Sequence, residues 1–156
     1  MNLSDHFTLE ELCKSQIAER NGIDNSLSED TEQGRAIIAS LRALCVNILE
    51  PVRTHYGIPI KPNSGYRCGE LNDKLGSKPT SQHIKGEAVD FEIAGVSNHD
   101  LAVWIRDNLT FDQLILEHYV PGQPQSGWVH CSYVSSGNRS SVLTINKTGT
   151  TRDLVQ

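Results

Sequence analysis

The sequence lacks the segments that would place the protein in a membrane or on a secretory route. No stretch approaches the roughly 18 consecutive apolar residues that indicate a membrane-spanning helix. The N-terminal segment MNLSDHFTLEELCKS has neither a basic start nor an apolar core, and it therefore predicts no secretory signal. We expect a protein that is made in the cytoplasm, stays there unless something else releases it, and has no membrane partner.

Cysteine is sparse, and its spacing is not that of a metal-binding or redox motif. The four cysteines, at positions 13, 45, 68 and 131, form no CxxC pair. Cys13 and Cys45 fall on apolar positions of expected helices, where a reduced thiol behaves as a small hydrophobic group. Because a cytoplasmic chain also meets reducing conditions, we predict free thiols and no disulfide.

Basic charge is also in short supply. Lys and Arg together number 14, whereas Asp and Glu number 19, and the formal net charge is -5. Domains that bind nucleic acid usually present a basic face, so this balance argues against a nucleic-acid partner.

Internal repeats and low-complexity segments are absent, and the chain length suits one domain. The chain has 156 residues, and a domain of about 150 residues buries roughly 68–70% of the surface of its unfolded chain. We predict a single domain over residues 1–156, with N-terminal helices at about 8–55 and a sheet at about 60–146.

Helical patterns come early in the chain. The segment 8–20 starts with Thr8 and has Glu11 three residues later, which is the capping-box spacing of a helix start. Apolar residues recur every three or four positions over 31–55, which predicts a long helix that Pro51 kinks or shortens. A further helix is expected over 97–109.

Strand patterns come late, with short connections between them. Strands are expected at 88–93, 111–119, 128–134 and 141–146. Together with the early helices they predict an α+β fold, in which a small antiparallel sheet is covered by helices on one side.

Strand alternation places three polar side chains on the uncovered face of this sheet. Successive side chains of a strand point to opposite faces. If the apolar sets pack on the helices, the other face carries Asp90, Glu117 and His130. His83 lies in the loop before the first of these strands, where Gly86 can turn the chain back toward the same face.

Two imidazoles and one carboxylate that meet at one spot suit a zinc ion and leave its fourth position open. Such a site also needs a base to take a proton from water, and Glu117 is the candidate because it shares the face. Taken singly, each residue has a plain structural reading, such as an exposed loop histidine or a solvated acid at a strand end. Only the combination favours a metal site.

Four segments in order resemble a known enzyme group. SGYR at 64–67, SQHIKGEAVDF at 81–91, QLILE at 113–117 and GWVHCSY at 127–133 are together similar to the M15 zinc peptidases. This group contains D-alanyl-D-alanine carboxypeptidases and L-alanyl-D-glutamate endopeptidases. The resemblance covers about residues 35–146, and the N-terminal helix fits the short phage-borne members. It implies a fold of the hedgehog/D,D-peptidase type.

The resemblance implies a role for five residues. His83, Asp90 and His130 match the ligands of one Zn²⁺ ion per chain. Arg67 matches an arginine near the substrate, where a guanidinium can bind a carboxylate or stabilise an oxyanion. Ser81 matches a motif serine that can hydrogen-bond the backbone of the substrate.

One position departs from the pattern of several relatives. They carry the catalytic acid three residues before the last histidine, and here that position is Gly127, which has no side chain to act as a base. In the phage-type branch an acid ends the preceding strand instead, and Glu117 matches it. Asp112 and His118 are lesser candidates, and His118 is predicted to point away from the site.

The function that the resemblance implies is hydrolysis of peptide bonds in the stem peptides of peptidoglycan, as in a phage endolysin. The protein is then expected to be a monomer that is stored in the cytoplasm of the host bacterium and acts on the cell wall after release. The bond cleaved stays open among L-Ala–D-Glu, D-Ala–diaminopimelate and terminal D-Ala–D-Ala. One alternative is a zinc-containing binding domain of the same fold without catalysis. Another is a wall-degrading protein of the virion.

Overall fold

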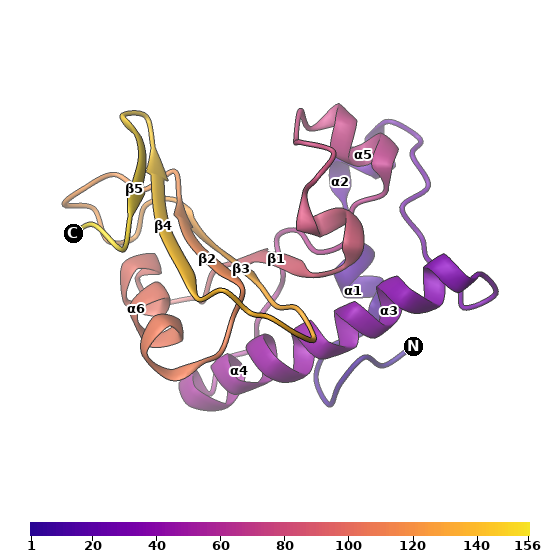
Figure 1. Cartoon of the computed structure of the whole chain (residues 1–156), viewed down its shortest axis with the longest axis horizontal. Coiled ribbons are helices and arrows are strands. Elements are labelled where there is room, and N and C mark those ends of the chain that lie inside the picture. Colours follow the sequence, from indigo (N-terminus) through magenta and orange to yellow (C-terminus); the bar gives the residue numbers. More distant parts are fainter.

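A computed structural model describes all residues, 1–156. In chain order its elements are α1 Leu9–Cys13, α2 Gln16–Arg20, α3 Glu32–Leu44, the π-helix η1 Cys45–Leu49, α4 Glu50–Tyr56, α5 Gly69–Lys74, the 3₁₀-helix η2 Gln82–Lys85, β1 Ala88–Phe91, α6 Asn98–Asn108, β2 Gln113–Glu117, β3 Trp128–Ser132, β4 Ser141–Asn146 and β5 Gly149–Arg152. The fold is α+β, as the sequence predicts (Figure 1). None of its helices combines the length and the apolar character needed to cross a bilayer.

The first expected helix is two short helices in the structure. Thr8 and Glu11 form the predicted capping box at the start of α1. The chain then becomes extended at Lys14, and the hydroxyl of Ser15 accepts a hydrogen bond from the backbone N–H of Ala18 to begin α2. The prediction of one continuous helix was therefore wrong, because a serine at this point can start a new helix.

The long expected helix runs through α3, η1 and α4 without a break. Pro51 has no N–H to donate and crowds the turn before it. The five-residue π-helix η1 directly precedes α4, and Pro51 lies in the first turn of α4. The wider π turn thus carries the helix past the proline. Gly57, in the left-handed conformation with φ 66°, ends α4.

The sheet has five strands in the order β1-β3-β2-β4-β5. β3 pairs antiparallel with β1 and with β2, and β4 pairs antiparallel with β5. β2 and β4 are parallel, so the sheet is mixed rather than purely antiparallel. The loop after β3 returns to the start of β2, where the backbone of Ser141 donates to the carbonyl of Asp112. β4 therefore runs in the same direction as β2.

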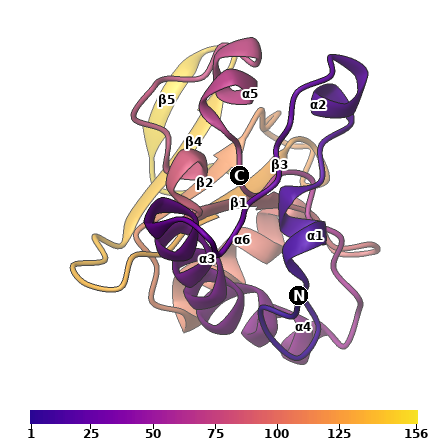
Figure 2. The ribbon, with the colours of Figure 1, turned by 90° about the vertical axis from the view of Figure 1, so that its right-hand side faces the viewer.

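The hydrophobic core lies between the sheet and the helices. Its main cluster joins inward residues of β1, β2 and β3 to α3, η1 and α6. In Figure 1 the helix α3–α4 runs along the bottom of the molecule, and α2 and α5 stand apart from the strands. Figure 2 shows α2 and α5 above α1. All four cysteines are free thiols, as predicted.

The predicted strand alternation holds in the three strands nearest the site. Val89, Leu114, Leu116 and Val129 are fully buried toward the helices. The polar residues between them face the other side, where they border a cavity of about 750 Å³.

Candidate metal centre and active-site cavity

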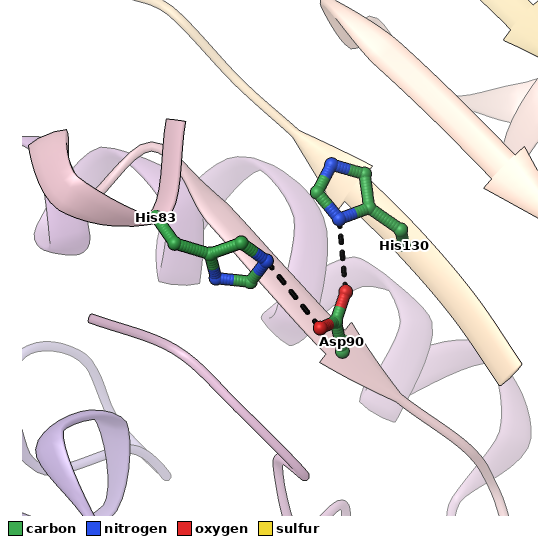
Figure 3. A group of neighbouring side chains, drawn as sticks. All are labelled: His83, Asp90 and His130. Carbon is green, nitrogen blue, oxygen red and sulfur yellow. Dashed lines mark hydrogen bonds and ion pairs between the residues drawn. The ribbon is translucent and has the colours of Figure 1, made fainter. Parts of the chain in front are cut away.

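His83, Asp90 and His130 all line this cavity and lie next to one another (Figure 3). They lie on η2, β1 and β3, and Asp90 and His130 are direct partners in the strand register. One potential ligand atom from each residue lies within 4.8 Å of the others. The cluster therefore offers two imidazole nitrogens and a carboxylate oxygen to one metal ion.

One of the two short separations in this cluster equals that of two ligand atoms on a tetrahedral ion. Two ligand atoms bound at about 2.0–2.2 Å to a tetrahedral zinc lie roughly 3.3–3.6 Å apart. Nε2 of His83 is 3.4 Å from Oδ2 of Asp90. Nδ1 of His130 is 2.8 Å from Oδ1 of Asp90, which is the shorter separation of a direct hydrogen bond.

The position of His83 is determined by its neighbours in η2. The hydroxyl of Ser81 accepts a hydrogen bond from the backbone N–H of His83 and so caps the 3₁₀-helix. Gly86 ends it with φ 71°, and a Cβ at Gly86 would lie 2.8 Å from the carbonyl oxygen of Ile37. Glycine is thus required both by the turn and by the close approach to α3.

A backbone contact orients the ring of His83. Its Nδ1 lies 2.7 Å from the carbonyl oxygen of Gly65. Since a carbonyl can only accept, Nδ1 carries the hydrogen and Nε2 keeps a free lone pair toward Asp90. Burial lowers the pKa of His83, which favours the neutral ring that a metal ligand needs.

Asp90 is held in its charged form although it is only 8% exposed. Burial by itself would raise the pKa of the Asp90 carboxyl, but the hydrogen bond from His130 and the neighbouring imidazole of His83 hold this pKa well below its usual value. Nη2 of Arg67 also donates to Oδ2 of Asp90 at 3.1 Å. An ionised carboxylate between two imidazoles fits a divalent cation such as zinc.

Arg67 borders the cavity but is anchored on the protein. Its Nε donates to the hydroxyl of Ser64 at 3.0 Å and its Nη1 to the hydroxyl of Ser77 at 3.3 Å, in addition to the contact with Asp90. Each terminal nitrogen keeps one further N–H. The guanidinium therefore positions a candidate metal ligand, Asp90, and still has N–H donors for a molecule bound in the cavity.

Glu117 lies at the end of β2 and borders the same cavity as the three clustered residues. Burial raises the pKa of the Glu117 carboxyl, and no hydrogen bond from a neighbouring residue stabilises its charged form. Such a carboxylate accepts a proton more readily than an exposed one, because its charged form is less well stabilised.

The geometry explains why no acid occupies position 127. Gly127 has φ 69°, and a Cβ there would lie 1.9 Å from the carbonyl oxygen of Glu117. Any side chain at 127 would therefore displace the backbone of β2. Because Glu117 pairs with Trp128 in the strand register, the acid at this edge of the cavity comes from the neighbouring strand.

His118 was predicted to point away from the site, and this was wrong. It lines the cavity, and its ring stacks on that of Trp128 with centroids 4.7 Å apart. The strand alternation stops at Glu117, because His118 adopts the left-handed conformation with φ 52°. A local backbone reversal of this kind leaves no periodic signal in the sequence.

The carboxylate of Asp112 is taken up by hydrogen bonds to neighbouring side chains. Nε and Nη2 of Arg139 donate to its two oxygens at 3.0 and 2.8 Å, and the side-chain amide of Gln82 donates at 3.1 Å. Asp112 thus ties the loop after β3 to the segment that carries His83. Its expected lesser role as a base does not fit these contacts.

Ser81 lines the cavity and also caps η2. Several further lining residues were not predicted, namely Lys78, Gln82, Gln113 and Arg139. Arg139 follows a serine- and glycine-rich segment without periodicity, so no sequence pattern places it there. Gln82 and Gln113 stand inside the quoted motifs, and the strand-face argument extended to Gln113 would have found that residue.

The chain was compared with protein-family models and with curated proteins, and a family model matches it. No curated protein matches the chain. The family model described as Peptidase M15 matches residues 5–132, which include all four motif segments except the last residue of the fourth. With a His83–Asp90–His130 cluster that can hold a metal ion, the chain belongs to the M15 peptidases, a family of metallopeptidase type.

Proposed function

We propose that this protein is a zinc-dependent peptidase that hydrolyses peptide bonds in the stem peptides of peptidoglycan. One observation carries the proposal. Three potential ligand atoms within 4.8 Å of one another lie in a cavity that also contains an acid with a raised pKa and no hydrogen bond. The resemblance of the motifs to wall-directed M15 peptidases supports the choice of substrate.

A zinc ion held by His83, Asp90 and His130 would supply an activated water and polarise the scissile carbonyl. Glu117 accepts a proton from the attacking water and passes it to the nitrogen of the leaving amine. The raised pKa of Glu117 favours the first transfer, because it makes the carboxylate a stronger base toward the attacking water. Arg67 offers its remaining N–H groups to the oxygen on which negative charge develops, a contribution of about 3 kcal/mol for one such donor.

In this proposal the partner is the peptide part of peptidoglycan and the protein acts as a monomer. Storage in the host bacterial cytoplasm before release to the wall follows from the resemblance to phage endolysins. No nucleic acid or membrane takes part.

Digestion of purified peptidoglycan tests the proposal. The metal content of the purified protein is measured by elemental analysis, and released fragments are identified by mass spectrometry with and without a chelator. We expect about one zinc per chain and chelator-sensitive fragments whose new termini identify the bond cleaved. Stoichiometric zinc without any new termini would instead indicate the binding domain without catalysis.

A further inference from the structure

A second cavity adjoins the candidate active site on the side of Arg67. Its volume is about 690 Å³. Arg67 and Leu75 border both cavities, so the two spaces are neighbours across these side chains. The second cavity is formed by the α1–α2 connection and by residues 61–64. Part of its lining comes from α1 and α2, whose positions can be followed in Figure 2.

The charge available in the second cavity is positive. Lys14 and Lys61 line it, are exposed, and take part in none of the ion pairs of the protein. Glu11 is the one acid among the lining residues, and its Oε2 accepts hydrogen bonds from the backbone N–H and the hydroxyl of Thr8. The cavity thus offers two ammonium groups without ion-pair partners, while the carboxylate of Glu11 is hydrogen-bonded to Thr8 in the capping box of α1.

Apolar contact area accompanies these charges. Ile17 is 39% exposed and Leu75 is 38% exposed, and both border the second cavity. Exposed aliphatic side chains between cations suit a ligand that combines carboxylates with an extended, partly aliphatic backbone.

We propose that the second cavity is a substrate subsite that binds a carboxylate-bearing part of the peptide beyond the scissile bond. This inference rests on the proposed function and adds a substrate preference to it. Peptides long enough to reach past Arg67 and acidic on that side are cleaved in preference to dipeptides. Two features carry the proposal: the second cavity adjoins the active-site cavity at Arg67 and Leu75, and Lys14 and Lys61 complement the charge of a carboxylate.

A peptide series with one constant scissile bond tests the preference. It contains a short peptide, a peptide extended by neutral residues and a peptide extended by acidic residues. We expect the acidic extension to give the highest kcat/KM. Lys14→Ala combined with Lys61→Ala should lower kcat/KM for that peptide roughly three- to ten-fold, mainly through KM, and leave the short peptide unchanged. Lys74→Ala, an exposed lysine of α5 outside both cavities, is the matched control.

Binding without turnover separates this inference from the proposed function. A labelled acidic peptide is titrated into the Glu117→Gln variant and followed by fluorescence anisotropy. The two lysine substitutions and high salt should each weaken its binding, whereas the neutral peptide should be insensitive to both. If the contrast appears but wild-type protein cleaves no peptide, the subsite stands and the peptidase proposal fails. If cleavage occurs and the lysine variant treats all three peptides like wild type, the subsite is refuted.

Discussion

Two corners of the active-site cavity are built in different ways. In the metal corner each side chain is fixed by neighbours: His83 by the carbonyl of Gly65, and Asp90 by Arg67 and His130. At the acid edge, Glu117 has no hydrogen bond and is followed by a residue in the left-handed conformation. The comparison indicates that the candidate metal ligands are held by several contacts, while the proposed proton-transfer group has no hydrogen bond that would stabilise one charge state.

Removal of a ligand from the rigid corner should have the largest effect. His83→Ala removes the ring whose Nε2 faces Asp90, and we expect metal affinity to fall by more than about 100-fold, with loss of hydrolysis. Elemental analysis after dialysis measures the effect. His55→Ala, an exposed histidine stacked on Trp104, is the control and should keep the metal. Undiminished zinc in His83→Ala would remove this residue from the site.

Substitution at the acid edge should separate catalysis from metal binding. Glu117→Gln keeps the size of the side chain but cannot accept a proton, so we expect hydrolysis to fall by about 10²–10⁴-fold at unchanged zinc content. Glu70→Gln, an exposed acid in the first turn of α5, should behave as wild type. Full activity of Glu117→Gln would mean that another group acts as the base. The proposed difference between a metal-binding corner and a proton-transferring edge would then be wrong.

Gly127 lies close to the backbone of Glu117, and we therefore expect a side chain at position 127 to lower the stability of the protein. In Gly127→Ala the new Cβ would lie 1.9 Å from the carbonyl oxygen of Glu117 at a φ of 69°. We expect the free energy of unfolding to fall by about 2–4 kcal/mol in urea titrations, because both strain and backbone displacement contribute. Gly122→Ala is the matched control, since φ there is 82° but no atom lies within 4 Å. Equal losses in both variants would show that the conformation alone, and not the contact with Glu117, requires glycine.

The smallest effect is expected at Asp112, which lies outside the active-site cavity and ties the loop after β3 to η2. Hydrogen bonds from Arg139 lower the pKa of Asp112 below its model-compound value of 3.8. The stability that this lowering provides is present above pH 3.8 and is lost as the pH falls through the lowered pKa. Asp112→Asn should lower the free energy of unfolding by about 1–3 kcal/mol at neutral pH.

Urea unfolding between neutral and acid pH tests this prediction. The difference between wild type and Asp112→Asn should narrow as the medium becomes more acidic. Asp107→Asn is the control, because that carboxylate is exposed and contacts the neighbouring Arg106. A constant difference at all pH values would mean that the charge of Asp112 contributes nothing.

Much of the candidate site follows from local patterns in the sequence. The two-residue period of a strand is a local property, and it places Asp90, Glu117 and His130 on one face regardless of what surrounds them. The turn at Gly86 likewise follows from the freedom of glycine in the left-handed conformation. Capping residues such as Thr8 mark helix starts for the same local reason.

Other features depend on parts of the chain that meet only after folding. The parallel pairing of β4 with β2, the bidentate contact between Arg139 and Asp112, and the cavity beside Arg67 each join segments distant in sequence. The reversal at His118 lies beside a contact between remote segments, because Gly127 approaches the backbone of Glu117 and His118 closely. By itself the sequence determined which side chains share a face, since that depends on the repeat of the backbone. Only the tertiary structure decided which neighbours surround them, because close packing between remote segments has no period along the chain.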